Sequence, residues 1–276
     1  MKDNKQSLPF SVEKCQKGFA TIYIILGIVI VVAVGSVFFV TRSNSSLQPA
    51  SKDSSQDLPD QRKEADKFII ANPVDLTQIR KISKFRSCSG HDFSGQNLER
   101  VREKNRSMKH YFKPAAPFAS SIGDVKVFAP FNGRIKSVRD EREPRGKETI
   151  LESDTTSWDV TIFHLDLLTN LKEGSEITAG ELLGHAHIAS QGNDFDIAVT
   201  KFVGGIPQGE NMQGFFFSMI MMDSVFNHMT ADVLSDFEKV NVTLENIIIT
   251  QNDRDQTPRD FEQRDEKVSD WVELKY

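Results

Sequence analysis

The chain has 276 residues, a length that suits one or two domains, and 38% of them are apolar while 26% are charged. Its formal net charge of −5 gives no polyanion-binding signature, which argues against a nucleic-acid partner. The two cysteines, Cys15 and Cys88, form neither a disulfide framework nor a CxxC metal motif.

An uncharged run of 22 residues, 19–40, follows a short polar leader. As a helix it would reach about 33 Å, enough to cross a hydrocarbon core of about 30 Å. Four lysines precede the run and only Arg42 follows it closely, so the positive-inside rule keeps the N-terminus in the cytoplasm. We therefore expect a basic cytoplasmic leader over 1–18, one transmembrane helix over 19–41, and a single-pass protein of the lipid bilayer whose remaining mass is extracytoplasmic.

The segment Lys17-Gly18-Phe19 resembles the leader of type IV pilins and pseudopilins. That resemblance implies cleavage after Gly18 and a role as a filament component. The pilin family has Glu at the fifth position after the cleavage site, where this chain has Tyr23. A plain membrane anchor, trimmed after Gly18 or left whole, is the alternative.

Three further regions follow the predicted span. Residues 42–66 are rich in Ser, Gln, Asp and Pro, cannot bury enough surface to offset ordering entropy, and are predicted to be a flexible linker. Residues 67–123 show few periodic features and are predicted to be irregular. Residues 206–276 are predicted to form a helical extension that ends in a charged tail.

Residues 124–205 have the pattern of short strands separated by Gly and Asn turns. Apolar side chains alternate with period two, as expected of strands with one buried face. The predicted strands are 125–129, 134–138, 148–152, 158–164 and 194–199. Several short strands of this kind indicate a mainly β fold, a small barrel or sandwich.

Four phrases in this region resemble the lysostaphin-type peptidoglycan endopeptidases. They are VFAPFNGRI (127–135), IFHLD (162–166), LKEGSEITAGELLGH (171–185) and NDFDIAV (193–199). The resemblance implies a small lysostaphin-like β-barrel over 124–205. Biotinyl and lipoyl domains share half of that barrel, but they need a modifiable lysine in a hairpin, which this region lacks.

In that family, zinc is held by an early His-x-x-x-Asp motif and by the second His of a later His-x-His. The His of a His-Leu motif and the first His of His-x-His assist the chemistry. The resemblance places His164 and Asp194 at the assisting positions and Asp196 at a zinc-ligand position. The early motif falls near His110, and Pro114 stands where its Asp should be. Catalytic zinc usually has three protein ligands, so these substitutions imply no cofactor and a lost peptidase activity.

A cluster before the predicted barrel offers an alternative zinc site. Cys88, His91 and Asp92 lie together in CSGHD, and all three residue types bind zinc. If this loop folds across the groove, it could complete a zinc site with His164, Asp196 or His110. Otherwise the histidine and the aspartate make hydrogen bonds within a loop, and the cysteine is buried.

Asp194 and Asp196 share one face of their predicted strand, whereas Phe195 and Ile197 share the other. Because the apolar face belongs in the core, the carboxylates are expected to line a ligand groove together with His164. There they would accept hydrogen bonds from sugar hydroxyls or amides, or bind the local backbone. The basic stretch 100–110 either contacts an anionic envelope polymer or is a solvated loop.

The sequence thus predicts a membrane-anchored, extracytoplasmic cell-envelope protein with an inactive peptidase-like domain that binds or scaffolds. Its predicted partners are the bilayer and peptidoglycan or another envelope glycan or protein. Two alternatives remain: a zinc-dependent peptidoglycan hydrolase with rearranged ligands, and a pilin-like filament component.

Overall fold

A computed structural model describes six stretches of the chain. They are residues 67–119, 124–141, 146–188, 194–204, 219–261 and 266–276. The predicted leader, transmembrane helix and linker lie outside the described residues. Within the described stretches, no helix is both long enough and apolar enough to cross a membrane.

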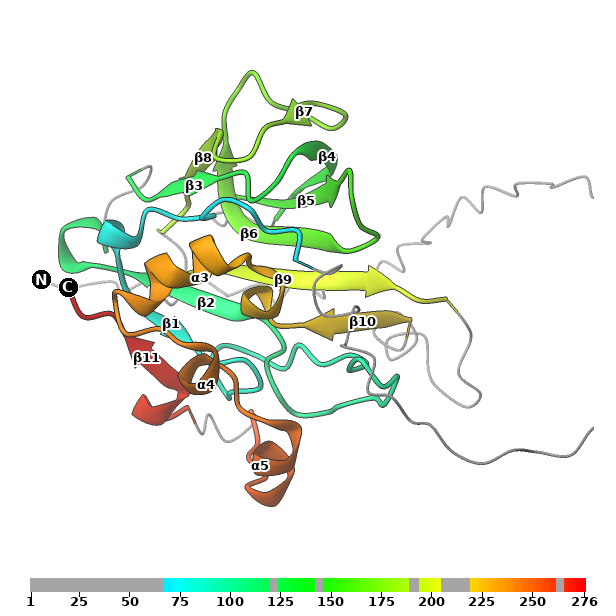
Figure 1. The fold of residues 1–276 in the computed structure, drawn as a ribbon, viewed down its shortest axis with the longest axis vertical. Coiled ribbons are helices and arrows are strands. Elements are labelled where there is room, and N and C mark those ends of the chain that lie inside the picture. Colours follow the sequence, from blue (N-terminus) through cyan, green and yellow to red (C-terminus); the bar gives the residue numbers. More distant parts are fainter. Residues whose placement is uncertain (1–66, 120–123, 142–145, 189–193, 205–218, 262–265) are drawn as a thin grey trace, which may run out of the picture. The chain divides into compact units, whose positions relative to one another are not determined.

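The described stretches contain eleven strands that form one antiparallel sheet (Figure 1). The strands are β1 (Ile79–Ser83), β2 (His110–Pro114), β3 (Lys126–Phe128), β4 (Gly133–Asp140), β5 (Lys147–Ser153), β6 (Asp159–Leu167), β7 (Glu176–Ile177), β8 (Leu182–Ala186), β9 (Phe195–Phe202), β10 (Ile220–Asp223) and β11 (Trp271–Glu273). Their main order is β11-β1-β2-β9-β6-β5-β4-β7, while β10 pairs with β9, and β8 pairs with β3 and β6. The predicted mainly β class is confirmed.

Short helices follow the sheet toward the C-terminus. In the described residues the α-helices are α3 (Ala231–Glu238), α4 (Leu244–Ile247) and α5 (Gln251–Gln256). The 3₁₀ turns of the same stretches are η1 (Leu76–Gln78) and η2 (Ala116–Phe118), which lie earlier in the chain, and η3 (Val225–His228) and η4 (Val268–Asp270). Helix α3 packs through Phe237 on Phe226, with ring centroids 4.9 Å apart. The predicted helical C-terminal region therefore holds short helices, but it also contributes the strands β10 and β11.

Residues 67–123 are less irregular than the sequence predicts. They contribute β1 and β2 to the middle of the sheet, where β2 pairs with both β1 and β9. The apolar residues of these strands are few, but they enter the main core: Ile79, Ile82 and Phe112 are fully buried. Phe112 stacks on Phe195 of β9 with centroids 5.2 Å apart. The sheet thus extends well beyond the 124–205 region of the sequence.

A bulge in β6 divides that strand between two sets of neighbours. Residues up to Phe163 pair with β9, and Leu165 and its successors pair with β8, while the pairing with β5 shifts register between Ile162 and Leu165. Between them His164 has φ of 59°, a left-handed conformation that is unusual for a residue with a side chain. Bulges of this kind re-aim side chains. Leu165 returns to the core, and the His164 ring meets carboxylates from two other segments.

Candidate functional site

One face of the β2–β9 pair is charged although it is largely buried. Tyr111 stands directly opposite Asp196 in the strand register, so the two side chains share a face. Alternation along β2 then places Lys109 and Lys113 on that same face, and alternation along β9 places Asp194 there. The opposite face holds the core residues of both strands. The site is therefore built from Lys113 of β2 and Asp196 of β9, together with Lys109 and Asp194, which directly precede those two strands.

Lys109 and Asp196 form the centre of the site. The Lys109 Nζ lies 2.5 Å from the Asp196 Oδ2, and the two side chains are 3% and 0% exposed. Three aromatic rings surround the ammonium at 4.5–5.0 Å from their centroids, those of Phe93, Tyr111 and Phe163. Each ring face attracts a cation electrostatically. The ammonium is thus held by a carboxylate and by an aromatic cage.

His91 completes the surroundings of Lys109. Its Nδ1 lies 3.0 Å from the carbonyl oxygen of Asp92, which only accepts, so Nδ1 carries the proton. The unprotonated Nε2 then accepts from the Lys109 ammonium at 3.3 Å. Burial and the Lys109 charge lower the pKa of His91. His91 is therefore a neutral imidazole that accepts a hydrogen bond from the buried Lys109 ammonium.

Asp196 is ionised in this environment. Burial alone would raise its pKa, but Lys109 and His164 together outweigh that effect and hold the pKa below its usual range. The same carboxylate raises the pKa of Tyr111, which burial has already raised. The buried negative charge is thus compensated by two cationic side chains.

His164 lies between two carboxylates. Its Nδ1 is 2.7 Å from Glu141 Oε2 and its Nε2 is 3.3 Å from Asp196 Oδ1. The backbone N–H of His164 also donates to Glu141 Oε2 at 3.0 Å, which fixes the bulge. Burial opposes the charged form, but the hydrogen bonds to Asp196 and Glu141 prevail and raise the pKa of His164 to about 10. At neutral pH the ring is an imidazolium that donates from both nitrogens.

Asp194 and Lys113 form a looser pair at the edge of the site. Lys113 Nζ lies 3.7 Å from Asp194 Oδ2, and both side chains are partly exposed. Burial raises the pKa of Asp194 to about 6; Lys113 opposes this rise and Asp196 adds to it. Lys113 also lies over the Trp271 ring, 4.6 Å from its centroid. The outer pair therefore loses its charge balance in mildly acidic solution.

The structure places His110 away from this site, on the opposite side of β2. Its Nδ1 lies 2.7 Å from the Ser83 carbonyl oxygen and its Nε2 lies 2.8 Å from Ser224 Oγ. The carbonyl requires a proton on Nδ1, so Nε2 accepts from the serine hydroxyl. Burial lowers the pKa of His110 to about 4. Both nitrogens are engaged in the core, and neither points toward Asp196.

The CSGHD cluster is divided between two places. His91 reaches the site through Lys109, whereas Asp92 accepts hydrogen bonds from Ser94 and from the backbone N–H of Arg106. Cys88 is buried elsewhere, where Arg254 Nη2 lies 3.1 Å from its Sγ. Asp196 is fully buried rather than facing an open groove. The structure thus brings together His164, Asp196, Asp194 and His91, but not Cys88 or His110.

Zinc, the metal that the resembled family holds at this place, does not fit these residues. Asp196, which only the resemblance places at a zinc-ligand position, already pairs with the Lys109 ammonium, and an imidazolium such as His164 has no lone pair to offer a metal. Among the described residues, no group of three His, Cys, Asp or Glu side chains is arranged to hold a metal ion. The local chemistry is that of a self-neutralised ion network.

Sequence reasoning missed Lys109, Lys113 and Glu141. The two lysines have the four-residue spacing expected of the early His-x-x-x-Asp motif, but they begin one residue before His110. Their signal was the phrase KHYFK, in which both lysines share the face opposite His110 and Phe112. Glu141 follows a strand and carries no comparable signal.

No protein-family profile matches the chain, and no curated protein matches it in sequence. Solved structures that resemble it include a zinc-containing peptidase from Vibrio cholerae, with 17% identity and a TM-score of 0.32 over 46% of this chain and 35% of that one. A chain of the SpoIIQ–SpoIIIAH pore-forming complex matches with 13% identity and a TM-score of 0.38, over 63% and 97%. Lysostaphin matches with 14% identity and a TM-score of 0.27, over 50% and 55%. These are distant similarities of fold, and the chain spans about a third of the Vibrio peptidase.

Proposed function

We propose that this chain is a membrane-anchored, extracytoplasmic envelope protein whose lysostaphin-like domain acts as a binding or scaffolding module and not as a peptidase. The Lys109–Asp196 ion pair is the observation that carries this proposal. It supports a domain in which Asp196, at the position of a peptidase zinc ligand, forms a structural ion pair and does not bind a metal. The bilayer and an envelope glycan or protein are the proposed partners.

The positive charge of Lys109 opposes the binding of a catalytic metal ion at Asp196. A divalent metal at Asp196 would lie next to the Lys109 ammonium, and two cations repel each other strongly where burial removes water. Lys109 would have to leave its aromatic cage before a metal could bind. The ammonium itself has no open coordination position and cannot activate water as zinc does.

His164 is equally unsuited to hydrolysis. A general base needs a free nitrogen and a pKa near the working pH. With a pKa of about 10 and a carboxylate on either side, His164 is a protonated donor at neutral pH. Its role in the network is to neutralise Glu141 and Asp196 at once.

Metal content and hydrolysis test this proposal. The full chain, purified in detergent and dialysed against metal-free buffer, is expected to hold far less than one zinc per chain by plasma mass spectrometry. It is also expected to leave purified peptidoglycan intact in a gel assay. One zinc per chain, lost from a His164→Ala variant, together with cleavage of peptidoglycan, would establish the hydrolase instead.

Binding and anchoring need their own measurements. Sedimentation with insoluble peptidoglycan, and crosslinking in envelope fractions followed by identification of the partner, test the binding role. Membrane fractions washed with alkaline carbonate are expected to retain the full chain and to release a variant that lacks residues 1–41. A chain that neither sediments nor crosslinks to any envelope component is not a binding module.

A further inference from the structure

The contact between Lys109 and Asp196 holds an amine against a carboxylate in the interior of the protein. Nζ lies 2.5 Å from Oδ2, and the two side chains are 3% and 0% exposed. The rings of Phe93, Tyr111 and Phe163 surround the nitrogen. Pairing of β2 with β9 keeps the two groups in place, because Tyr111 stands opposite Asp196 in the register. Well-oriented groups held in contact react as if each were present at about 10⁵–10⁸ M.

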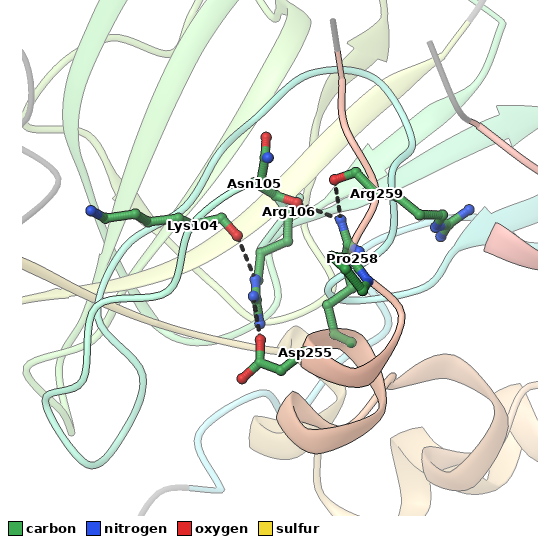
Figure 2. Close-up of a pocket in the computed structure, with 7 residues that line it drawn as sticks. Lys104, Asn105, Arg106, Asp255, Pro258 and Arg259 are labelled. Carbon is green, nitrogen blue, oxygen red and sulfur yellow. Dashed lines mark hydrogen bonds and ion pairs between the residues drawn. The ribbon is translucent and has the colours of Figure 1, made fainter. Parts of the chain in front are cut away.

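Two other kinds of ion pair in the described residues show what distinguishes Lys109. Lys239 pairs with Asp236, but both side chains are exposed to water. Arg106 is largely buried, and Figure 2 shows it directed at Asp255, with an N–O distance of 2.6 Å. A guanidinium stays protonated in proteins, so it has no lone pair with which to attack a carbonyl carbon. Lys109 combines an amine that can lose a proton with a buried carboxylate.

His91 is placed to take that proton. Its unprotonated Nε2 lies 3.3 Å from the Lys109 Nζ. An ammonium becomes a nucleophile only after it loses a proton, and a neutral imidazole is a suitable acceptor. Burial and the Lys109 charge lower the pKa of His91, and His91 is exposed, so it can pass the proton on to water. The amine end of the pair therefore has a general base.

His164 is placed at the carboxylate end of the pair. Its Nε2 lies 3.3 Å from Asp196 Oδ1, and its Nδ1 lies 2.7 Å from Glu141 Oε2. A proton delivered from Nε2 to Oδ1 makes the carboxyl carbon more electrophilic. Glu141 still accepts from Nδ1 afterwards, so the neutral ring keeps its orientation. The carboxylate end therefore has a general acid, and the two histidines act on opposite ends of one contact.

We propose that Lys109 and Asp196 condense to form an amide bond inside the protein. His91 is the general base and His164 is the general acid. The ammonium gives one proton to His91 Nε2, and His164 gives its Nε2 proton to Asp196 Oδ1. Nζ then bonds to Cγ, and the Cγ–Oδ1 bond breaks. Water leaves with Oδ1, the proton from His164 and one proton from Nζ, while Oδ2 becomes the amide oxygen and Nζ keeps one hydrogen. The reaction consumes no oxidant, reductant or cofactor.

The condensation removes two buried charges. An ion pair in the interior is costly because both ions lose their water, whereas an amide carries no net charge. The aromatic rings around Nζ exclude the water that would reverse the reaction. The ion pair of the structure is the state before the bond forms. Both the ion pair and the amide keep a metal ion from Asp196, so this inference does not depend on the proposed function.

Mass spectrometry of the denatured full chain, purified in detergent, tests the bond. We expect its mass to be lower than that of the unlinked chain by one water. Trypsin cannot cleave after an acylated Lys109, and Lys113 is protected because Pro114 follows it. The digest should therefore contain peptide 107–126 joined to peptide 173–201, lighter by one water than their sum. Fragmentation should place the link at Lys109 and Asp196. Two separate peptides, with cleavage after Lys109, overturn the proposal.

Two lysine variants make the test specific. Lys109→Arg keeps a positive charge but cannot form the amide, and should yield only unlinked peptides. Lys113→Arg is the matched control on the same face of β2, next to Asp194, and should retain the link. A link that starts at Lys113 or ends at Asp194 overturns the assignment.

A histidine variant tests the chemistry where a Lys109 variant fails to fold. His91 is exposed, so His91→Gln should fold; glutamine can accept a hydrogen bond but cannot take up a proton. We expect the amide to form about 100-fold more slowly in this variant, measured as the linked fraction at successive times after pulse labelling. Equal rates in His91→Gln and the wild type refute the role of His91 as the base.

Discussion

Lys109 and Asp196 meet diagonally across β2 and β9, with Nζ 2.5 Å from Oδ2 and both side chains buried. The pair does not stand alone, because Asp196 also contacts His164, and His164 contacts Glu141. Two cations and two carboxylates therefore alternate in one continuous series. Each charge is compensated within the protein, and the predictions below follow from removing one member at a time.

Lys109→Met should be strongly destabilising. It leaves the Asp196 carboxylate buried with only His164 as a partner, and breaking a buried pair typically costs about 3–5 kcal/mol. The loss, measured by urea unfolding followed by circular dichroism, should shrink as the pH falls, because Asp196 then protonates. Lys109→Met combined with Asp196→Asn is the control and should recover much of the free energy of unfolding. A single variant as stable as the wild type contradicts the pairing.

The His164 imidazolium should make stability decrease in alkaline solution. Its folded pKa of about 10 lies above its unfolded value, so its contribution is complete below about pH 6.5 and is lost as the pH rises through 10. The difference in free energy of unfolding between the wild type and Glu141→Gln should therefore narrow as the pH approaches 10. Nuclear magnetic resonance should show no His164 titration between pH 5 and 8. A midpoint near 6.5 would refute the double carboxylate contact.

The raised pKa of Asp194 should make the free energy of unfolding depend on pH between about 3.8 and 6. Its folded pKa of about 6 exceeds its unfolded value of 3.8, so its contribution is present below 3.8 and lost as the pH rises through 6. Asp194→Asn should therefore stabilise the protein at pH 7.5, by about 1 kcal/mol after allowing for its partial exposure, and have little effect at pH 3.5. Lys113→Met should raise the Asp194 pKa further. An Asp194→Asn variant that is destabilised at pH 7.5 contradicts the assignment.

Gly90→Ala should disturb the site through Tyr111. A Cβ at Gly90 would lie 2.2 Å from the Tyr111 ring, and the backbone φ of +71° disfavours any side chain. We expect a loss of about 2–4 kcal/mol from overpacking and strain together. Gly180→Ala, where φ is +82° but the space is open, isolates the strain alone and should cost about 1 kcal/mol. Equal melting temperatures for the two variants would show that the Tyr111 ring moves aside freely.

The strands between residues 125 and 199 could be predicted from the sequence, because apolar and polar residues alternate within each of them. Phe195 and Ile197 are buried in the core, as their period-two spacing predicts, and β3 to β6 lie where Gly and Asn turns divide the sequence. Strands β1 and β2 were missed. Their charged residues resemble a solvated segment, and only pairing with β9 and β11, far along the chain, makes them strands.

Some residues of the site could be named from the sequence and others could not, because only some of them lie in a recognisable local pattern. His164, Asp194 and Asp196 stood out by residue type and by their place in the family motifs. Lys109 did not stand out, because lysine is rarely buried and its carboxylate partner, Asp196, lies far away in the sequence. His110 faces the core, on the opposite side of β2 from Asp196, because successive residues of a strand face opposite sides. The bulge at His164 depends on Glu141 and could not be read from alternation.

The buried ion pair also governs how β2 can align with β9 during folding. The two strands are distant in sequence, so their pairing closes a long loop and is expected late. A slip of one residue would drive the Lys109 ammonium into the space of Phe112 and Phe195, among apolar rings with no carboxylate. A misaligned pairing would therefore bury the Lys109 charge at a large cost in free energy, whereas the native alignment places the Asp196 carboxylate beside it. The Lys109–Asp196 pair therefore favours one register of β2 on β9 over its neighbours.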